Sequence, residues 1–160
     1  MLITRPLDGA ARTASLVQAL GFSPVLAPLL TVRHFSPSVP LQPQAVLVTS
    51  GNALQGLPLL AAPLLAVGDA TAAHARDAGF AQLHSAAGDA NALVETAARL
   101  LRPAAGPLLL ASGRGQGLGV AAALRARGFS VIRRVTYEAT PVGEFPAEAT
   151  ACLRAELLHA

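Results

Sequence analysis

The sequence predicts an α/β protein built on parallel sheets, and three observations support this. A helical stretch rich in Ala and Leu ends in Gly-Phe and leads directly into an apolar strand three times, at Gly21-Phe22, Gly79-Phe80 and Gly128-Phe129. Strands such as Ala45–Val48 are continuous apolar runs, as expected when helices cover both faces of a sheet. Hairpin turn signals are missing between successive strands. Repeated βα units of this kind are typical of a parallel sheet.

The expected elements alternate along the chain. Each glycine of the Gly-Phe pairs supplies the left-handed position that ends a helix, and the Phe can pack back on the last turn. Helical core spacing is clearest where Leu93, Ala97 and Leu100 fall on one stripe. We expect strands at Leu2–Arg5, Pro24–Val32, Ala45–Thr49, Leu64–Val67, Ala81–His84, Pro107–Ala111 and Ser130–Thr136. We expect helices at Ala10–Leu20, Asn52–Leu60, Thr71–Ala78, Asn91–Leu101, Leu118–Arg127 and Ala147–His159.

Two proline-rich stretches, His34–Pro43 and Ala139–Pro146, interrupt this alternation. Five of the seven expected strands lie between them, enough for one open sheet. The sequence therefore predicts one complete α/β domain inserted into a second, outer domain. The boundaries we expect are residues 44–137 for the inserted domain, 1–35 and 141–160 for the outer domain, and 36–43 and 138–140 for the linkers.

Composition narrows the class of protein. The chain has 160 residues, of which 52% are hydrophobic and 13% charged, and such a chain folds. Residues 35–68 carry no charge, but prolines divide them, whereas a membrane helix needs about 20 apolar residues in a row. The N-terminus lacks a signal peptide pattern. Cys152 is the single cysteine, so no internal disulfide forms. We expect a cytoplasmic protein that does not enter a membrane.

The charges favour an anionic partner. Residues 1–136 carry 11 Arg and 5 acidic residues, whereas residues 137–160 carry 1 Arg and 4 acidic residues. The larger part of the chain is thus basic. The arginines are scattered, and no basic run with interleaved aromatic residues occurs, so the pattern does not predict binding to nucleic acid.

Several expected strands end in turns that carry hydroxyl groups or glycine at the start of a helix. Ligands of open parallel sheets bind outside the carboxyl ends of the strands, where backbone N–H groups and helix dipoles favour anions. The alternative is that Ser50, Asp69 and Asp89 merely cap helices. The candidate binding residues are Thr4, Arg5, Thr49, Ser50, Asn52, Asp69, Thr71, Gly113 and Arg114.

The glycine-rich segment Ser112–Gly119 follows a strand and opens a helix, where a dinucleotide fingerprint would lie. The six-residue glycine pattern is not met, and only a looser variant ending in Ala fits Gly117–Ala122. The next strand carries Arg133 and Arg134 where an NAD site would have an acidic residue, although NADP could use Arg. An anion-contacting loop is the preferred interpretation.

Tyr137 is the only tyrosine of the chain and lies where the last expected strand meets the second linker. Its phenol can donate a proton or a hydrogen bond while staying uncharged at neutral pH. The alternative is that it only packs against the linker. One cysteine and four scattered histidines offer no zinc-ligand spacing, and neither a nucleophile elbow nor a Walker A sequence is present.

The ordered set of these motifs resembles the uroporphyrinogen-III synthase family, and the resemblance runs through the whole chain. The segments that carry it are Leu2–Pro6, Leu20–Phe22 with Pro28–Leu30, Val46–Ala53, Ala66–Ala72, Gly88–Ala90 and Val135–Pro141.

The resemblance implies two flavodoxin-like domains joined by two linkers, with the active site in the cleft between them. It implies a lyase of tetrapyrrole (haem) biosynthesis that uses no cofactor and no metal. The substrate would be hydroxymethylbilane, a linear tetrapyrrole bearing eight carboxylates, which the enzyme closes with inversion of ring D and loss of water. Within the family a linker tyrosine assists departure of the hydroxide, and that role would belong to Tyr137.

Members of the family continue beyond the point that matches residue 160. We therefore expect an incomplete outer domain that leaves a sheet edge open, weak or absent synthase activity, and self-association through that domain. Two other readings stay open. One is a flavodoxin-like module that binds a nucleotide or phosphate without catalysis, and titration with NADP and FMN would reveal it. The other is an inactive remnant that pairs with a partner.

Overall fold

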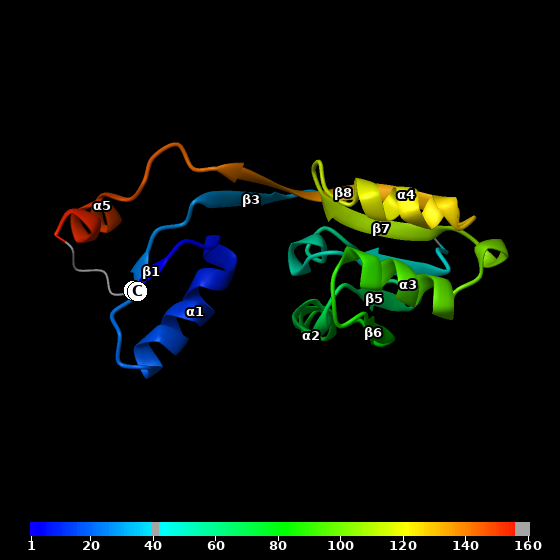
Figure 1. Ribbon diagram of the computed structural model, residues 1–160, viewed down its shortest axis with the longest axis horizontal. Coiled ribbons are helices and arrows are strands. Elements are labelled where there is room, and N and C mark those ends of the chain that lie inside the picture. Colours follow the sequence, from blue (N-terminus) through cyan, green and yellow to red (C-terminus); the bar gives the residue numbers. More distant parts are fainter. Residues whose placement is uncertain (40–41, 156–160) are drawn as a thin grey trace. The chain divides into compact units, whose positions relative to one another are not determined.

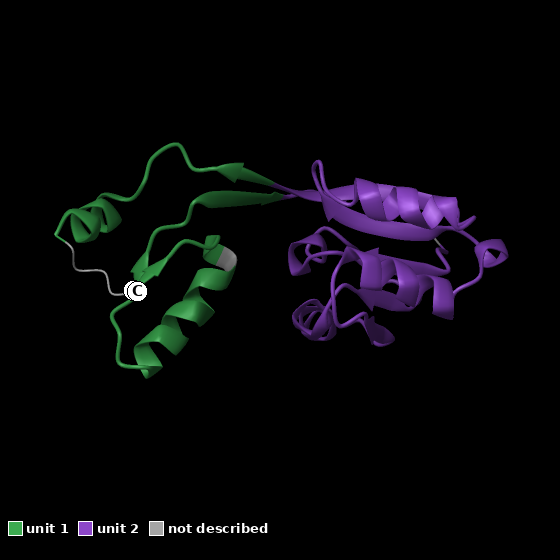
Figure 2. Ribbon diagram, viewed as in Figure 1, with its two compact units in different colours: residues 1–33, 139–160 green, residues 34–138 purple. Residues whose placement is uncertain are grey.

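The computed structural model describes residues 1–39 and 42–155 and has the expected α/β architecture (Figure 1). The chain divides into two compact units, one formed by residues 1–33 and 139–160 and the other by residues 34–138 (Figure 2). We call them unit 1 and unit 2. No helix in the described ranges is long and apolar enough to cross a membrane.

Unit 2 contains a mostly parallel sheet, which confirms the predicted fold class. The strand order is β8-β7-β4-β5-β6, every neighbouring pair in this series is parallel, and β3 is added beside β8. The strands are β4 (Ala45–Val48), β5 (Leu64–Ala66), β6 (Leu83–Ser85), β7 (Leu108–Gly113), β8 (Val131–Pro141) and β3 (Leu30–His34). Residues 30–33 of β3 and 139–141 of β8 belong to unit 1.

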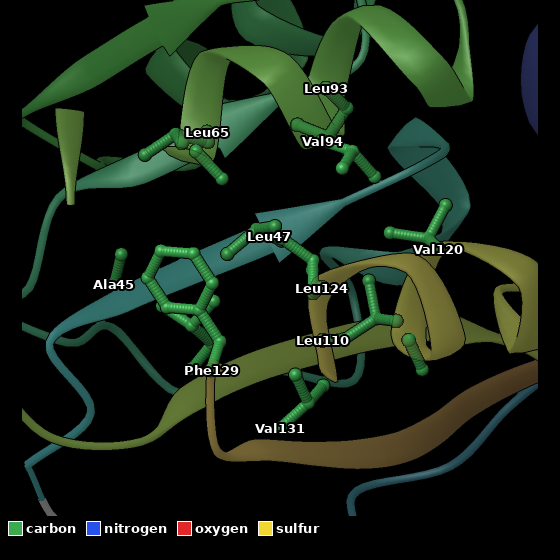
Figure 3. Packing of buried hydrophobic residues seen from close by; sticks show 13 residues of the cluster. Ala45, Leu47, Leu65, Leu93, Val94, Leu110, Val120, Leu124, Phe129 and Val131 are labelled. Atoms are coloured by element: carbon green, nitrogen blue, oxygen red, sulfur yellow. The ribbon is translucent and has the colours of Figure 1, made fainter. Parts of the chain in front are cut away.

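Helices cover both faces of this sheet because its strands are apolar on both sides. The α-helices of unit 2 are α2 (Asp69–Asp77), α3 (Ala90–Leu100) and α4 (Leu118–Ala126), and the 3-10 turns are η1 (Gly51–Ala53) and η2 (Pro103–Ala105). In Figure 3, Leu93 and Leu124 point from α3 and α4 toward Leu47 and Leu110 of the sheet. The segment η1 and helix α2 contact β7, β5 and β6. All four residues of β4 are fully buried, which explains its unbroken apolar sequence.

The Gly-Phe pairs end helices as the sequence predicts. Gly21, Gly79 and Gly128 all have positive φ, between 83° and 95°. At Phe129 the backbone N–H donates to the carbonyl of Leu124, and Gly128 N–H donates to the carbonyl of Arg125. This is the two-bond closure of a Schellman motif, and the other two pairs repeat it. Phe80 and Phe129 are buried, whereas Phe22 is 46% exposed.

Unit 1 is small. Strands β1 (Leu2–Ile3) and β2 (Val25–Leu26) form a two-stranded parallel sheet, and α1 (Leu7–Ala19) and α5 (Ala147–Arg154) are its helices. Its core consists of Ile3, Ala10 and Val17, with Ala14 packed against them. The last part of the helix expected to end at His159 lies outside the described residues.

The expected strand Pro24–Val32 is wrong as a single element. The chain forms β2 and β3 and leaves Ala27–Leu29 between them without regular structure. Pro28 cannot donate a backbone hydrogen bond, so it interrupts a sheet ladder. Strand β3 instead runs antiparallel to β8, because Phe35 N–H donates to Thr136 O and Val142 N–H donates to Leu29 O.

The expected helix Asn52–Leu60 is also wrong, because only Asn52 and Ala53, the last two residues of η1, are helical there. Gly56 is buried, and a side chain at this position would collide with the carbonyl oxygen of Phe35 and with Thr136. Pro58 cannot donate a backbone hydrogen bond inside a helix. Tertiary packing thus holds this segment as a series of turns. The last expected strand ends at Thr136. In the structure β8 continues to Pro141 and so includes residues 138–140, where the sequence predicts a linker.

Candidate functional site

The sheet of unit 2 has a topological switch point between β4 and β7. From β4 the chain proceeds to β5 and β6 on one side, and then returns to β7 and β8 on the other. The turns that leave β4 and β7 therefore diverge at the carboxyl edge of the sheet, which is where open α/β sheets bind ligands. The candidate residues of unit 2 all lie at or near this edge.

The turn after β4 contains Thr49, Ser50 and Asn52, all of them half-buried. The hydroxyl oxygen of Ser50 accepts a hydrogen bond from the backbone N–H of Asn52 at 3.3 Å. Ser50 therefore caps η1, as the capping alternative proposes. Gly51 lies directly under His74 of α2, and a side chain at Gly51 would collide with its imidazole.

The next two turns along the sheet end in the N-termini of α2 and α3. Asp69 is exposed in the first turn of α2, and the side chain of Thr71 is 8% exposed. Asp89 is a helix cap, because its carboxylate accepts hydrogen bonds from Asn91 N–H at 2.9 Å and Ala92 N–H at 3.0 Å. Asp69 and Asp89 are both exposed, whereas Thr71 is buried.

The loop after β7 is tied down by side chains. Arg133 of β8 donates from Nε to the carbonyl of Gln116 at 2.8 Å and from Nη2 to the carbonyl of Gly113 at 3.1 Å. The hydroxyl of Ser112 donates to the same Gln116 carbonyl at 3.0 Å. Arg134 donates to the carbonyl of Ser38 at 2.7 Å. Arg133 and Arg134, the two arginines that an NADP phosphate could use, therefore both donate hydrogen bonds to backbone carbonyls within unit 2.

Tyr137 lies beside this loop and is 3% exposed. Its hydroxyl donates a hydrogen bond to Oε1 of Gln116 at 2.6 Å. Its carbonyl accepts from the backbone N–H of Arg114 at 2.8 Å. Its ring packs closely against Gly113, where an added Cβ would lie 2.7 Å from Cζ. The position therefore combines tight packing with a directed hydroxyl group.

The side chain of Arg114 is 60% exposed and already has partners. Its Nε lies 2.7 Å from a carboxylate oxygen of Glu138, and its guanidinium lies 5.7 Å from the ring centroid of Phe35. Ion pairs this exposed contribute about 0–1 kcal/mol. A carboxylate of a ligand can therefore replace Glu138 at small cost.

Thr4 and Arg5 belong to unit 1, where they follow β1. Both are exposed, and Arg5 donates from Nη1 to the hydroxyl of Thr13 at 2.9 Å. The same unit has an open, mostly apolar groove. Its lining residues are Pro6, Leu7, Pro28, Leu30, Thr31 and Val32.

Sequence reasoning missed Gln116, Glu138 and Phe35, and it considered Arg133 only as a possible contact to a nucleotide phosphate. Gln116 could have been found from the sequence, because it is the one long uncharged polar side chain in the glycine-rich segment Ser112–Gly119. The contacts that Phe35 and Glu138 make with Arg114 could not be predicted, because both residues lie far from Arg114 along the chain. Within residues 1–39 and 42–155, no three His, Cys, Asp or Glu side chains come together as a metal site would require.

Two kinds of comparison place this chain among known proteins. The family model described as "Uroporphyrinogen-III synthase HemD" matches residues 11–160. A solved mutant of uroporphyrinogen III synthase from Thermus thermophilus is 24% identical, with a TM-score of 0.51 and coverage of 88% of this chain. The uroporphyrinogen-III synthetase from Helicobacter pylori is 18% identical, with a TM-score of 0.58 and coverage of 81%. At this level of identity the two structures show a shared fold.

The extent of these matches differs between the comparisons. The chain spans 64% of the length of the Thermus protein and 61% of the Helicobacter protein. A comparison with curated proteins finds no match. The family model, however, covers almost the entire sequence, and its description agrees with that of both structures. The chain belongs to the uroporphyrinogen-III synthase family.

Proposed function

We propose that this chain supplies the catalytic tyrosine and part of the substrate site of a uroporphyrinogen-III synthase. The reaction closes hydroxymethylbilane, inverts ring D and releases water. The observation that carries the proposal is the environment of Tyr137. The only phenol of the chain lies at the carboxyl edge of the sheet, next to the switch point, with its hydroxyl directed at a polar loop.

Tyr137 would act on the leaving group. Its phenol donates the hydroxyl proton to the departing oxygen, the C–O bond breaks, and water leaves. Formation of the final ring bond releases a proton, which returns the phenol to its neutral form. The phenol is uncharged at neutral pH, so it places no negative charge beside a substrate with eight carboxylates until its proton has moved.

The remaining residues would bind the substrate carboxylates. In unit 2 these are Thr49, Ser50, Asn52, Asp69, Thr71, Gly113 and Arg114, and in unit 1 they are Thr4 and Arg5. Arg114 is the strongest candidate among them, since its guanidinium is exposed and its partner Glu138 is exchangeable. The carboxylate of Asp69 would not bind an anion itself, so its contribution would come from the backbone N–H groups of its turn. A cytoplasmic location is part of the proposal.

The nucleotide-binding alternative has less support. An NADP site in this loop would use Arg133 or Arg134 for the 2′-phosphate, and both side chains are engaged with backbone carbonyls.

The test is an isomer assay with the natural protein that contains this sequence. Hydroxymethylbilane is supplied, and uroporphyrinogen III is separated from the uroporphyrinogen I that forms spontaneously. Excess of the type III isomer over a protein-free control supports the proposal. Formation of the type I isomer alone, at the spontaneous rate, would overturn it.

A further inference from the structure

Gln116 stands out because it is exposed and yet bonded to a buried group. The residue lies at the tip of the loop after β7, and its side-chain oxygen accepts the hydrogen bond of the Tyr137 hydroxyl at 2.6 Å. Tyr137 itself is 3% exposed. Gln116 thus lies between solvent and the phenol.

The backbone of Gln116 is held firmly while its side chain carries the contact. Its carbonyl oxygen accepts hydrogen bonds from both Arg133 and Ser112, and its N–H donates to the carbonyl of Gly113 at 3.0 Å. Gly113 in turn contacts the ring of Tyr137. Strand β8 therefore contacts the loop twice. Arg133 of this strand holds the loop backbone, and Tyr137 of the same strand contacts the Gln116 side chain.

A phenol has a single hydroxyl proton to donate. While Gln116 accepts it, the hydroxyl points in one fixed direction. A ligand oxygen that receives the proton while the hydroxyl keeps this direction must occupy the region where Oε1 now lies. The position of Oε1 therefore marks the direction in which Tyr137 can act.

We propose that Gln116 is a positioning residue for Tyr137, which holds the phenol hydroxyl toward the loop until an acceptor oxygen of the ligand replaces the amide oxygen. The inference rests on the proposed function for the identity of that ligand oxygen, the hydroxyl that leaves hydroxymethylbilane. The contact between Gln116 and Tyr137 does not depend on it.

The composition of the chain allows a direct test. The 160 residues include one tyrosine and no tryptophan, so tyrosine fluorescence and the near-ultraviolet absorption at wavelengths longer than the phenylalanine bands report on Tyr137 alone. Both signals respond to hydrogen bonding of the phenol. The variants are Gln116→Leu, which removes the acceptor at similar size, and Gln116→Glu, which keeps an acceptor oxygen. Gln82→Leu, at an exposed position on the same unit, is the matched control.

We expect Gln116→Leu to change the tyrosine spectrum of the 160-residue chain, Gln116→Glu to restore it, and Gln82→Leu to leave it as in the unsubstituted chain. In the natural protein, Gln116→Leu should lower kcat for the type III isomer about tenfold, the equivalent of one hydrogen bond, with KM within about twofold. Gln116→Glu should recover most of this loss. Thermal unfolding of each variant checks that it is folded.

Two results would overturn the inference. One is an unchanged tyrosine spectrum in folded Gln116→Leu, and the other is a kcat that falls equally in the Leu and Glu variants although the spectrum of the latter is restored. Failure of the unsubstituted protein to form the type III isomer would instead refute the proposed function, and the spectra would still decide whether Gln116 orients Tyr137.

Discussion

Tyr137 combines two properties that single substitutions can separate. Replacement by Phe keeps the ring packed on Gly113 and removes only the hydroxyl that Gln116 accepts. Loss of a proton donor typically costs about 10²-fold or more in rate. We expect Tyr137→Phe to slow formation of the type III isomer by that factor while unfolding free energy falls by only about 1 kcal/mol. An unchanged rate in the isomer assay would assign Tyr137 a packing role alone.

Ala87 is the one non-glycine residue with positive φ, at 51°, in the part of the chain that the structure describes. It is exposed, and its N–H donates to the hydroxyl of Ser85 at 3.1 Å. The left-handed conformation costs an L-residue about 1–2 kcal/mol. We expect Ala87→Gly to stabilise the chain by about 0.5–1 kcal/mol, since the gain is partly offset by entropy of the unfolded state. Chemical denaturation measures this, and a loss of stability would contradict it.

At the scale of elements, α4 offers opposite predictions at its two ends. Gly128 ends the helix with φ of 85°, so Gly128→Ala should destabilise the chain by about 1 kcal/mol. Gly119 is an exposed residue of the first turn, and an added Cβ meets nothing within 4 Å. Gly119→Ala should stabilise it by about 0.5–1 kcal/mol. Denaturation of both variants under one condition checks both predictions. Stabilisation by Gly128→Ala would refute the capping argument, and destabilisation by Gly119→Ala would refute the helix-propensity argument.

The ion pair between Arg114, in the loop after β7, and Glu138 of strand β8 leads to a prediction about ligand affinity. Glu138→Gln removes the carboxylate beside Arg114 and leaves the guanidinium exposed. Affinity for a polycarboxylate should rise by up to about fivefold at low salt, the range of an exposed ion pair. The gain should shrink as salt increases. Glu144→Gln makes the same charge change on an exposed residue of unit 1 and is the control. Equal gains in both variants would indicate a general charge effect.

At the scale of the whole molecule, the two units should differ in local stability. Unit 2 buries apolar strands between helices, whereas the parallel sheet within unit 1 consists of two strands of two residues each and packs on a small core. Two-stranded units are marginal in water. We expect amide hydrogens of β1 and β2 to exchange at least about tenfold faster than those of β4 and β7. Hydrogen-exchange mass spectrometry measures this, and equal protection would contradict it.

Much of the architecture could be predicted from the sequence because its causes are local. Continuous apolar strands, helical stripes and the Gly-Phe caps are read from neighbouring residues, and the mostly parallel sheet of unit 2 follows from their repetition. The failures occurred where distant contacts override local preference. The expected helix Asn52–Leu60 is replaced by turns because Gly56 packs against Phe35 and Thr136, which lie elsewhere in the chain.

The same division holds for the candidate site. The sequence by itself determined that Tyr137 is the only phenol, that a glycine-rich loop follows one strand, and that no zinc-ligand spacing exists. Only the tertiary structure decided that Gln116 accepts the Tyr137 hydroxyl, that Glu138 pairs with Arg114, and that Arg133 supports the loop. The physical reason is that strand pairing brings β7 and β8 together across the intervening helix α4. Their register sets which side chains meet. It shifts between Ser112 and Gly113, so that Gly113 lies opposite Tyr137, and the alternation of residues along either strand does not predict this irregularity.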